Sequence, residues 1–176
     1  MPARPRRTPT PASASRPPAA HSGAGKPSTP AFSGFVTETL KFLRALGFHQ
    51  SREWFEAHRD LYESALRGPM KAYVEALSAA CAARKIPLRG DPAKAVFRIH
   101  RDVRFSKNKH PYKTNGGCVI SRTGGKGAQG IVYTHVSPEG CFFAAGFRAL
   151  EPDQLLLFRK AIARKPNEFL AMEKRL

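Results

Sequence analysis

Apolar residues in the first half of the chain recur at helical spacing. They mark one face over residues 40–46, a second over residues 54–65 and a third over residues 70–81. Ser51 precedes the second face and is a good N-cap residue. Gly68-Pro69 separates the second face from the third and is expected to end one helix and begin another. The pattern therefore predicts three consecutive helices.

Beyond residue 92 the spacing of apolar residues changes from helical to alternating. Alternation over residues 97–105 predicts a half-buried strand, with Phe97, Ile99, Val103 and Phe105 on its packing face. Residues 118–121 predict a short strand. Residues 131–136 and 141–147 flank a Ser-Pro-Glu-Gly turn and predict a hairpin. A helix is expected from Glu151-Pro152 to Ile162, followed by a shorter helical piece after Pro166.

Helices followed by strands and again by helix indicate the α+β class. We expect N-terminal helices, a mainly antiparallel sheet and a C-terminal helix in a single domain over residues 32–176. Residues 1–31 are rich in proline and alanine, contain no acidic residue and show no apolar periodicity. Such a segment cannot bury enough apolar surface to offset its ordering entropy, so we expect a disordered tail.

The charge of the chain is strongly positive. Thirty lysines and arginines stand against thirteen acidic residues, a net charge of +17, and only five of the basic residues precede residue 32. The excess therefore belongs mainly to the ordered part and favours phosphate-rich partners. No apolar run is long enough for a membrane span, and no secretory signal is evident. The three cysteines are widely spaced, which argues against a zinc site or disulfide framework and favours the cytoplasm.

Basic and imidazole side chains are most concentrated in residues 97–113, FRIHRDVRFSKNKHPYK, here called the basic segment. On the expected strand, alternate residues project from one face, and the following loop adds lysines around the same mouth. Guanidinium groups offer forked donors to phosphate or carboxylate oxygens, and Asp102 can hold one arginine in place. We therefore predict a site for a small phosphorylated or otherwise anionic ligand. Its residues are Arg98, Arg101, Arg104, Lys107, Tyr112 and Lys113.

A catalytic role for this segment is left open. Asp102 and His100 are the candidates for acid–base chemistry, although a third group would be needed to orient them. His100-Arg101-Asp102 lacks the other kinase motifs, and the glycine-rich loop with Lys126 lacks Walker spacing. That loop could instead close over a ligand. We expect no metal and no cofactor.

Two other functions fit the same residues. The basic face, with the tail, could bind nucleic acid through several phosphates, which makes affinity strongly salt-dependent. Alternatively, Arg104 and Asp102 could form a purely structural buried network that ties the strand to the helices. Oligomeric state is not indicated by the sequence.

The sequence also resembles a known family. The motifs are Phe32-Ser33-Gly34-Phe35, Ser51-Arg52-Glu53-Trp54-Phe55, Asp91-Pro92, the run from Phe97 to Lys107, and Pro111-Tyr112-Lys113-Thr114. They are similar to the family catalogued as domain of unknown function 2461, over residues 32 to about 169. The family carries no established reaction. Its signature falls on Arg98, Arg101, Asp102, Arg104, Phe105, Ser106, Lys107, Pro111, Tyr112 and Lys113.

The resemblance carries two further expectations. The proline-rich tail before Phe32 lies outside it. Family members usually continue beyond the last helix into another basic segment, whereas this chain stops at Leu176. The resemblance thus implies a C-terminally shortened member, in which a sheet edge or a wall of the site can be missing.

Overall fold

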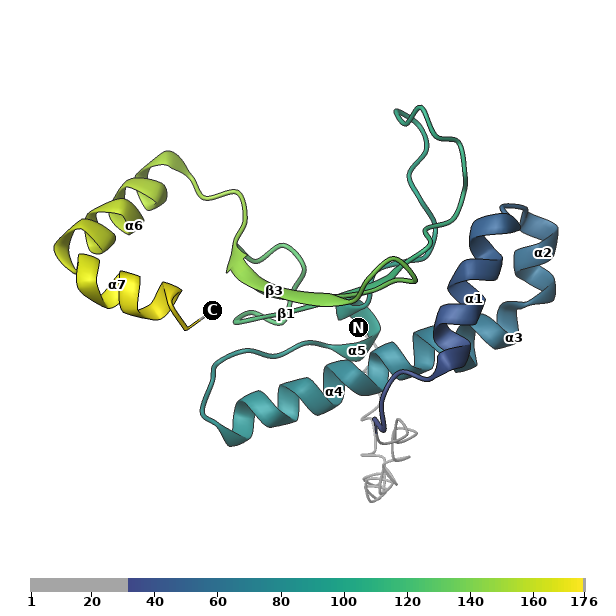
Figure 1. Cartoon of the computed structure of the whole chain (residues 1–176), viewed down its shortest axis with the longest axis horizontal. Helices are drawn as coiled ribbons and strands as arrows, with labels where there is room; N and C mark the ends of the chain where they lie inside the picture. The colour runs from purple at the N-terminus through teal and green to yellow at the C-terminus, as the bar shows by residue number, and fades with distance from the viewer. Residues whose placement is uncertain (1–31, 176) are drawn as a thin grey trace, which may run out of the picture.

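A computed structural model of the chain describes residues 32–175 (Figure 1). The tail expected over residues 1–31 lies outside the described residues. The described part has the predicted α+β arrangement, in which helices precede an antiparallel sheet and two further helices follow it. None of its helices combines the length and the apolar character needed to cross a bilayer.

Helices form one layer of the fold. Ser51 caps the second helix as predicted, since its Oγ accepts a hydrogen bond from the Trp54 N–H at 3.2 Å. The helix expected over residues 54–65 is divided at His58, where the backbone leaves helical geometry. The elements are α1 (Thr37–Phe48), α2 (Arg52–Ala57), α3 (Arg59–Tyr62), a π-helical turn η1 (Glu63–Arg67) and α4 (Gly68–Ala83).

Gly68-Pro69 begins α4 as expected, but contrary to our expectation it does not interrupt the helical backbone that precedes it. The wider η1 turn leads directly into α4, and Gly68 itself has helical φ and ψ of −60° and −56°. Pro69 lies in the first turn of α4, where a proline's missing N–H costs little. A Cβ on Gly68 would lie 2.9 Å from the carbonyl oxygen of Glu63. The glycine thus permits the close approach of backbone that the π-helical turn requires.

Three antiparallel strands form the second layer. They are β1 (Gly116–Ser121), β2 (Gly130–Val136) and β3 (Phe142–Phe147), in the order β1-β2-β3. Cys118 pairs with Thr134, and Thr134 pairs with Phe143. The predicted short strand and hairpin are therefore confirmed. Every residue of β1 is buried and every residue of β3 is exposed, so burial falls across the sheet from the β1 edge, which packs against α4, to the β3 edge.

The strand predicted over residues 97–105 is wrong. Within it the only isolated bridge of the described chain joins His100 to Tyr112, and a second one, between Val96 and Cys118, lies just before it. Of the expected packing face, Ile99 is buried at 3% exposure, whereas Phe105 is 95% exposed. The Asp102 carboxylate accepts a hydrogen bond from the N–H of Arg104, two residues on. Such a local turn competes with strand pairing, and the chain leaves the sheet as a projecting loop.

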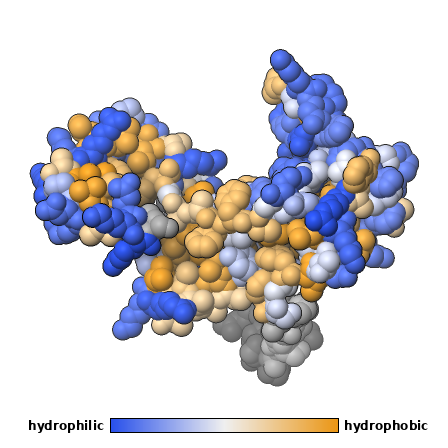
Figure 2. All heavy atoms as spheres, in the orientation of Figure 1, coloured by the Kyte–Doolittle hydropathy of each residue, from blue (hydrophilic) through white to orange (hydrophobic). Residues whose placement is uncertain are grey.

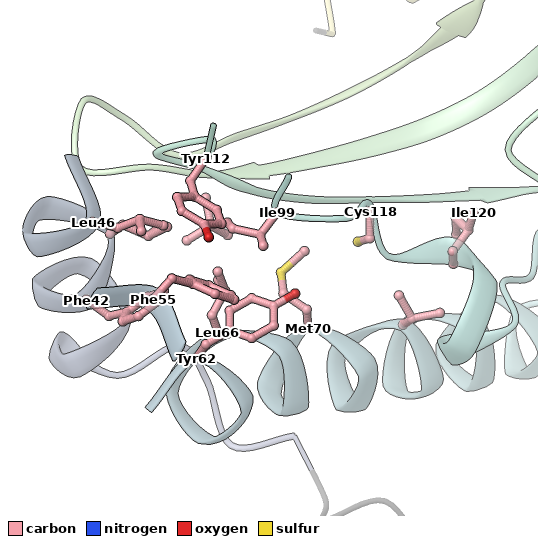
Figure 3. Packing of buried hydrophobic residues seen from close by; sticks show 14 of the residues in the cluster. Phe42, Leu46, Phe55, Tyr62, Leu66, Met70, Ile99, Tyr112, Cys118 and Ile120 are labelled. Atoms are coloured by element: carbon pink, nitrogen blue, oxygen red, sulfur yellow. The ribbon is translucent and has the colours of Figure 1, made fainter. Parts of the chain in front are cut away.

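The core lies between α4, the preceding helices and the sheet. Figure 3 shows Tyr112, Ile99, Cys118 and Ile120 meeting side chains from the helical layer. Tyr73 on α4 also shares a 3.0 Å hydrogen bond with Thr134 on β2, which ties the layers together. The buried side chains that α1 to α4 and η1 contribute to the cluster are Phe42, Leu43, Leu46, Phe55, Tyr62, Leu66, Met70, Val74 and Cys81.

The last two helices confirm the predicted C-terminal pieces. They are α6 (Pro152–Arg164), which starts with a capping box from Glu151 and Gln154, and α7 (Pro166–Glu173). Neither buries a residue, and both lie away from α4 (Figure 1). Hydrophobic side chains cover the middle of the face seen in Figure 2, where β3 runs. A short helix, α5 (Pro92–Ala95), leads into the basic segment.

Candidate anion-binding site

A pocket of about 570 Å³ lies between the helical layer and the start of the basic segment. One wall comes from α3, η1 and α4, and the other from residues 92–100, with Lys113 and Lys126 closing it. We call it the cationic pocket, because six basic side chains and one acidic side chain line it. The charged residues are Arg59, Glu63, Arg67, Lys71, Arg98, Lys113 and Lys126.

The helical wall presents its charges four residues apart. Arg67 donates to Glu63 at 2.7 Å, so the single acid of the wall is already paired. Arg59 donates to Glu56, which lies outside the pocket, through two hydrogen bonds of 2.9 and 2.8 Å. Lys71, one turn further along, forms no ion pair within residues 32–175. This wall thus keeps an excess of positive charge.

The opposite wall holds two ammonium groups against one short stretch of backbone. Lys113 donates from Nζ to the carbonyl oxygen of Arg98 at 3.0 Å, and Lys126 donates to that of Val96 at 2.6 Å. Both also lie near the Phe97 ring, at 5.8 and 4.7 Å from its centroid. The Lys113 backbone N–H donates to the carbonyl oxygen of Ile99 at 2.9 Å. These contacts direct two lysines from separate loops to one place.

Burial, and for Lys113 also repulsion from neighbouring cations, disfavours the charged form of the two lysines of this wall. Burial, followed by the nearby Arg98, Lys126 and Arg101, lowers the pKa of Lys113. Burial likewise lowers the pKa of Lys126. Within the described chain, no carboxylate forms an ion pair with Arg98, Lys113 or Lys126. An anion in the pocket would relieve this repulsion and favour the protonated lysines.

The structure brings only some of the predicted site residues together. Arg98 and Lys113 line the cationic pocket, and His100 lies in its wall. Lys126, considered from the sequence as part of a closing loop, joins them. The remaining predicted residues do not line this pocket: Arg101, Asp102, Arg104, Lys107 and Tyr112.

Residues 102–110 form an exposed loop, here called the basic arm, which projects at the upper right of Figure 1. Arg104 pairs with Asp102 at 2.7 Å, with the two side chains 75% and 44% exposed. Hydrogen bonds from Arg104 lower the pKa of Asp102, and the same pairing raises the pKa of Arg104. The pair is therefore local to the arm, and it is not the buried network that would tie a strand to the helices.

Tyr112 and His100 are placed by packing. Tyr112 is 3% exposed and stacks on Phe55 at a centroid distance of 4.5 Å, and burial raises the pKa of its hydroxyl. The Tyr112 N–H donates to Gln50 Oε1 at 3.1 Å. The His100 ring lies 5.6 Å from that of Phe55. Because the Asp102 carboxylate is engaged by Arg104, the structure gives the suggested His100–Asp102 acid–base pair no support.

Three residues of the helical wall were missed from the sequence: Arg59, Arg67 and Lys71. Their signal was present, since Arg59, Glu63, Arg67 and Lys71 recur every four residues and so share a helix face. The expected helix break at Gly68-Pro69 hid it, because it assigned Lys71 to a different helix from Arg67. Continuity through η1 places them on one wall. π-Helical turns of this kind often occur at functional sites.

The pocket offers binding groups rather than an evident nucleophile. Cys118 is buried behind it in β1, and burial raises the pKa of the thiol to about 11. Residues 32–175 contain no cluster of three or more histidine, cysteine or acidic side chains that could hold a metal ion. Hydrogen-bond donors and positive charge are therefore the chemistry that the site supplies.

The fold and the site define an α+β protein with one antiparallel sheet and a cationic pocket beside its helical layer. The chain belongs to the family described as "Conserved hypothetical protein (DUF2461)", whose model matches residues 38–175. This confirms the family resemblance drawn from the sequence. A search of curated proteins and a search of solved structures each gave no match.

Proposed function

We propose that the protein binds a small phosphate-bearing or similar anionic ligand in the cationic pocket. The observation that carries this proposal is the convergence of Arg98, Lys113 and Lys126 on one pocket without an ion-paired carboxylate in the described chain. Solvated surface charges are usually interspersed in sign, whereas Lys113 is repelled by its basic neighbours and both lysines are partly desolvated. A bound anion offsets both costs.

The arginine and the two lysines have different roles in this proposal. Arg98 supplies a planar guanidinium that can bind two oxygens of one phosphate. Lys113 and Lys126 supply point charges fixed by backbone carbonyls, so little side-chain entropy remains to be lost on binding. A pocket of about 570 Å³ is within the range of small-molecule sites, about 300–1,000 Å³.

Titration of the chain with pyrophosphate by isothermal calorimetry tests the proposal. We expect saturable binding that Arg98→Ala and Lys113→Met each weaken by about tenfold or more, the effect of one lost charge-assisted hydrogen bond. Arg44→Ala and Lys160→Met remove the same charges from exposed positions outside the pocket and are the matched controls. Equal losses in the pocket and control variants would show non-specific attraction and overturn the proposal.

The basic arm supports a second candidate, contact with nucleic acid. Lys107 and Arg104 are exposed there, and Phe105 is 95% exposed with the Arg104 guanidinium 5.8 Å from its ring centroid. An exposed aromatic ring among cations suits stacking on a base beside phosphate contacts. For single-stranded RNA, binding should fall with salt at a slope of about −0.7 per phosphate contacted. Weaker binding and a slope shallower by about 0.7 in the double variant Phe105→Ala with Lys107→Ala would support the arm, and unchanged affinity and slope would exclude it.

We also propose a cytoplasmic location. Cys81, Cys118 and Cys141 are free thiols in the structure, which suits a reducing compartment. Fluorescence microscopy of the tagged chain tests this directly, with diffuse cytoplasmic signal as the expected result. Enrichment in another compartment would contradict it.

A further inference from the structure

A second, smaller hollow of about 350 Å³ adjoins the cationic pocket. The two share Phe97 and Lys113 as lining residues and so lie side by side. We call the smaller hollow the ring subsite. Its residues are Phe97, Lys113, Asn115, Gly117, Tyr133 and His135.

Aromatic rings form much of the ring subsite. The Phe97 ring lies 6.1 Å from that of Tyr133, at an interplanar angle of 63°. His135 lies next to Tyr133 and is held from outside by Phe142, whose ring stacks on it at 4.8 Å and 15°. Phe97 keeps 36% exposure and is therefore not closed off by the protein core. Flat walls of this kind favour a planar guest.

Polar groups at the same place match the edge of a heterocycle. The Tyr133 hydroxyl and His135 Nδ1 are 2.9 Å apart, and Asn115 Nδ2 lies 3.5 Å from the same nitrogen. The Asn115 amide carries donors and an acceptor, the combination that pairs with a nucleobase edge. These groups are joined in a small network, so they are oriented before a ligand enters.

Gly117 keeps the subsite open. A Cβ at this position would lie 2.8 Å from the Tyr133 hydroxyl oxygen and 3.1 Å from Cε2 of its ring. Any larger residue would therefore push the Tyr133 ring out of its place. Because Gly117 of β1 has no side chain, the Tyr133 ring can occupy its place in the lining of the ring subsite.

We propose that the ring subsite holds the heteroaromatic base of a nucleotide whose phosphate lies in the cationic pocket. The inference rests on the proposed function, because the cationic pocket must bind the phosphate. It adds the class of ligand: a phosphate and a planar base joined by a short linker such as a sugar.

Calorimetric titration of the full chain with ribose 5-phosphate, AMP, GMP, CMP and UMP tests this inference. Ribose 5-phosphate carries the phosphate and the sugar without a base. We expect at least one nucleotide to bind about tenfold more tightly than ribose 5-phosphate, since stacking and edge contacts add to the phosphate contacts. Asn115→Ala and His135→Ala, which line only the ring subsite, should remove this preference and leave ribose 5-phosphate affinity unchanged.

The outcomes separate the two proposals. If ribose 5-phosphate and all four nucleotides bind equally, the ring subsite is overturned and the anion site stands. If the nucleotide preference survives in both variants, the base lies elsewhere and the ring subsite is likewise overturned. If neither these ligands nor pyrophosphate binds, both proposals fail. Thermal melting of each variant, compared with the parent chain, identifies a variant that has lost its fold.

Discussion

Lys113 is the residue on which the proposed site depends most. Its Nζ donates to the carbonyl oxygen of Arg98, and it lines both the cationic pocket and the ring subsite. Burial and three neighbouring cations lower its pKa. A lysine in this environment loses its proton more easily than one in solvent. A bound anion would favour the protonated form and so raise the pKa again.

Sulfate binding should therefore weaken as pH rises into the alkaline range. Sulfate keeps its charge between about pH 7 and pH 10, so any change belongs to the protein. Affinity should be full where Lys113 is protonated and fall as pH rises through its lowered pKa, before the ordinary lysine value of 10.5 is reached. The step should shrink in Lys113→Met. A flat profile would contradict the assignment of Lys113.

The same pKa shift has the opposite effect on the ligand-free chain. Because the folded state holds the Lys113 proton less tightly than the unfolded state, this group contributes a cost below its folded pKa. The cost is removed as pH rises from that value toward 10.5, so this contribution to the free energy of unfolding increases with pH. The stability of the ligand-free chain should therefore be measured by thermal melting at each pH at which sulfate is titrated, so that a change in folding is not mistaken for a change in affinity.

The exposed pair of Arg104 and Asp102 should matter little for folding. Both side chains lie largely in solvent on the basic arm, where ion pairs contribute little. We expect Arg104→Ala to melt at the same temperature as the matched control Arg44→Ala. A large fall in melting temperature in Arg104→Ala, but not in Arg44→Ala, would support the alternative in which Arg104 and Asp102 have a purely structural role.

At the scale of elements, the passage from η1 to α4 is a specific feature of this chain. An alanine at position 68 would ordinarily favour a helix by about 1 kcal/mol over glycine. Here its Cβ would lie 2.9 Å from the Glu63 carbonyl oxygen, and backbone would have to move. The clash with the Glu63 carbonyl oxygen should therefore outweigh the higher helix propensity of alanine.

Gly68→Ala should lower the free energy of unfolding by about 1 kcal/mol or more, the usual cost of overpacking. Gly47→Ala is the matched control, because Gly47 lies within α1 and its added Cβ would meet Thr114 Cγ2 at an ordinary 3.4 Å. That control should be neutral or stabilise by about 0.5–1 kcal/mol. Urea denaturation of both variants measures the difference, and equal effects would argue against the π-helical turn.

Elements with local signals could be predicted from the sequence. Cap or turn residues with a short-range effect mark three such elements. They are α2, which Ser51 caps, the β2–β3 hairpin and the helix that begins at Pro152. Residues 97–105 alternate like a strand, yet the described part of the chain provides no continuous partner strand for them. Pairing is a tertiary property, and the Asp102 turn took the backbone out of the sheet.

Only part of the candidate site could be predicted from the sequence, because its assembly also depends on tertiary structure. Arg98 and Lys113 belong to the conspicuous basic segment and do line the pocket. Arg104 and Lys107 share that segment but lie on the basic arm, because strand alternation does not hold there. Arg59, Arg67 and Lys71 come from a separate helix face, and only the fold shows that it faces Arg98.

For the whole molecule, stability should be unevenly distributed. The core joins α4, the helices before it and β1, whereas α6 and α7 bury no residue. Described links from α6 to the sheet side include a Phe147–Phe158 ring contact at 5.7 Å and a Gln129–Gln154 hydrogen bond of 2.7 Å. The C-terminal helices therefore depend on few contacts.

Hydrogen exchange monitored by mass spectrometry should show this gradient. Peptides from α4 and β1 should be the slowest to exchange, with opening free energies near that of global unfolding. Peptides from α6 and α7 should exchange much faster under the same conditions. Equal protection of these helices and α4 would mean that the C-terminal helices are part of one cooperative core.

We propose that small anions bind in the cationic pocket and not on the basic arm. Mapping of backbone amide chemical shifts during a pyrophosphate titration tests it most directly. Saturable shifts at Arg98, Lys113 and Lys126, with residues 104–110 unmoved, are the result we predict. Shifts confined to residues 104–110, or small unsaturable shifts spread over all basic residues, would contradict it.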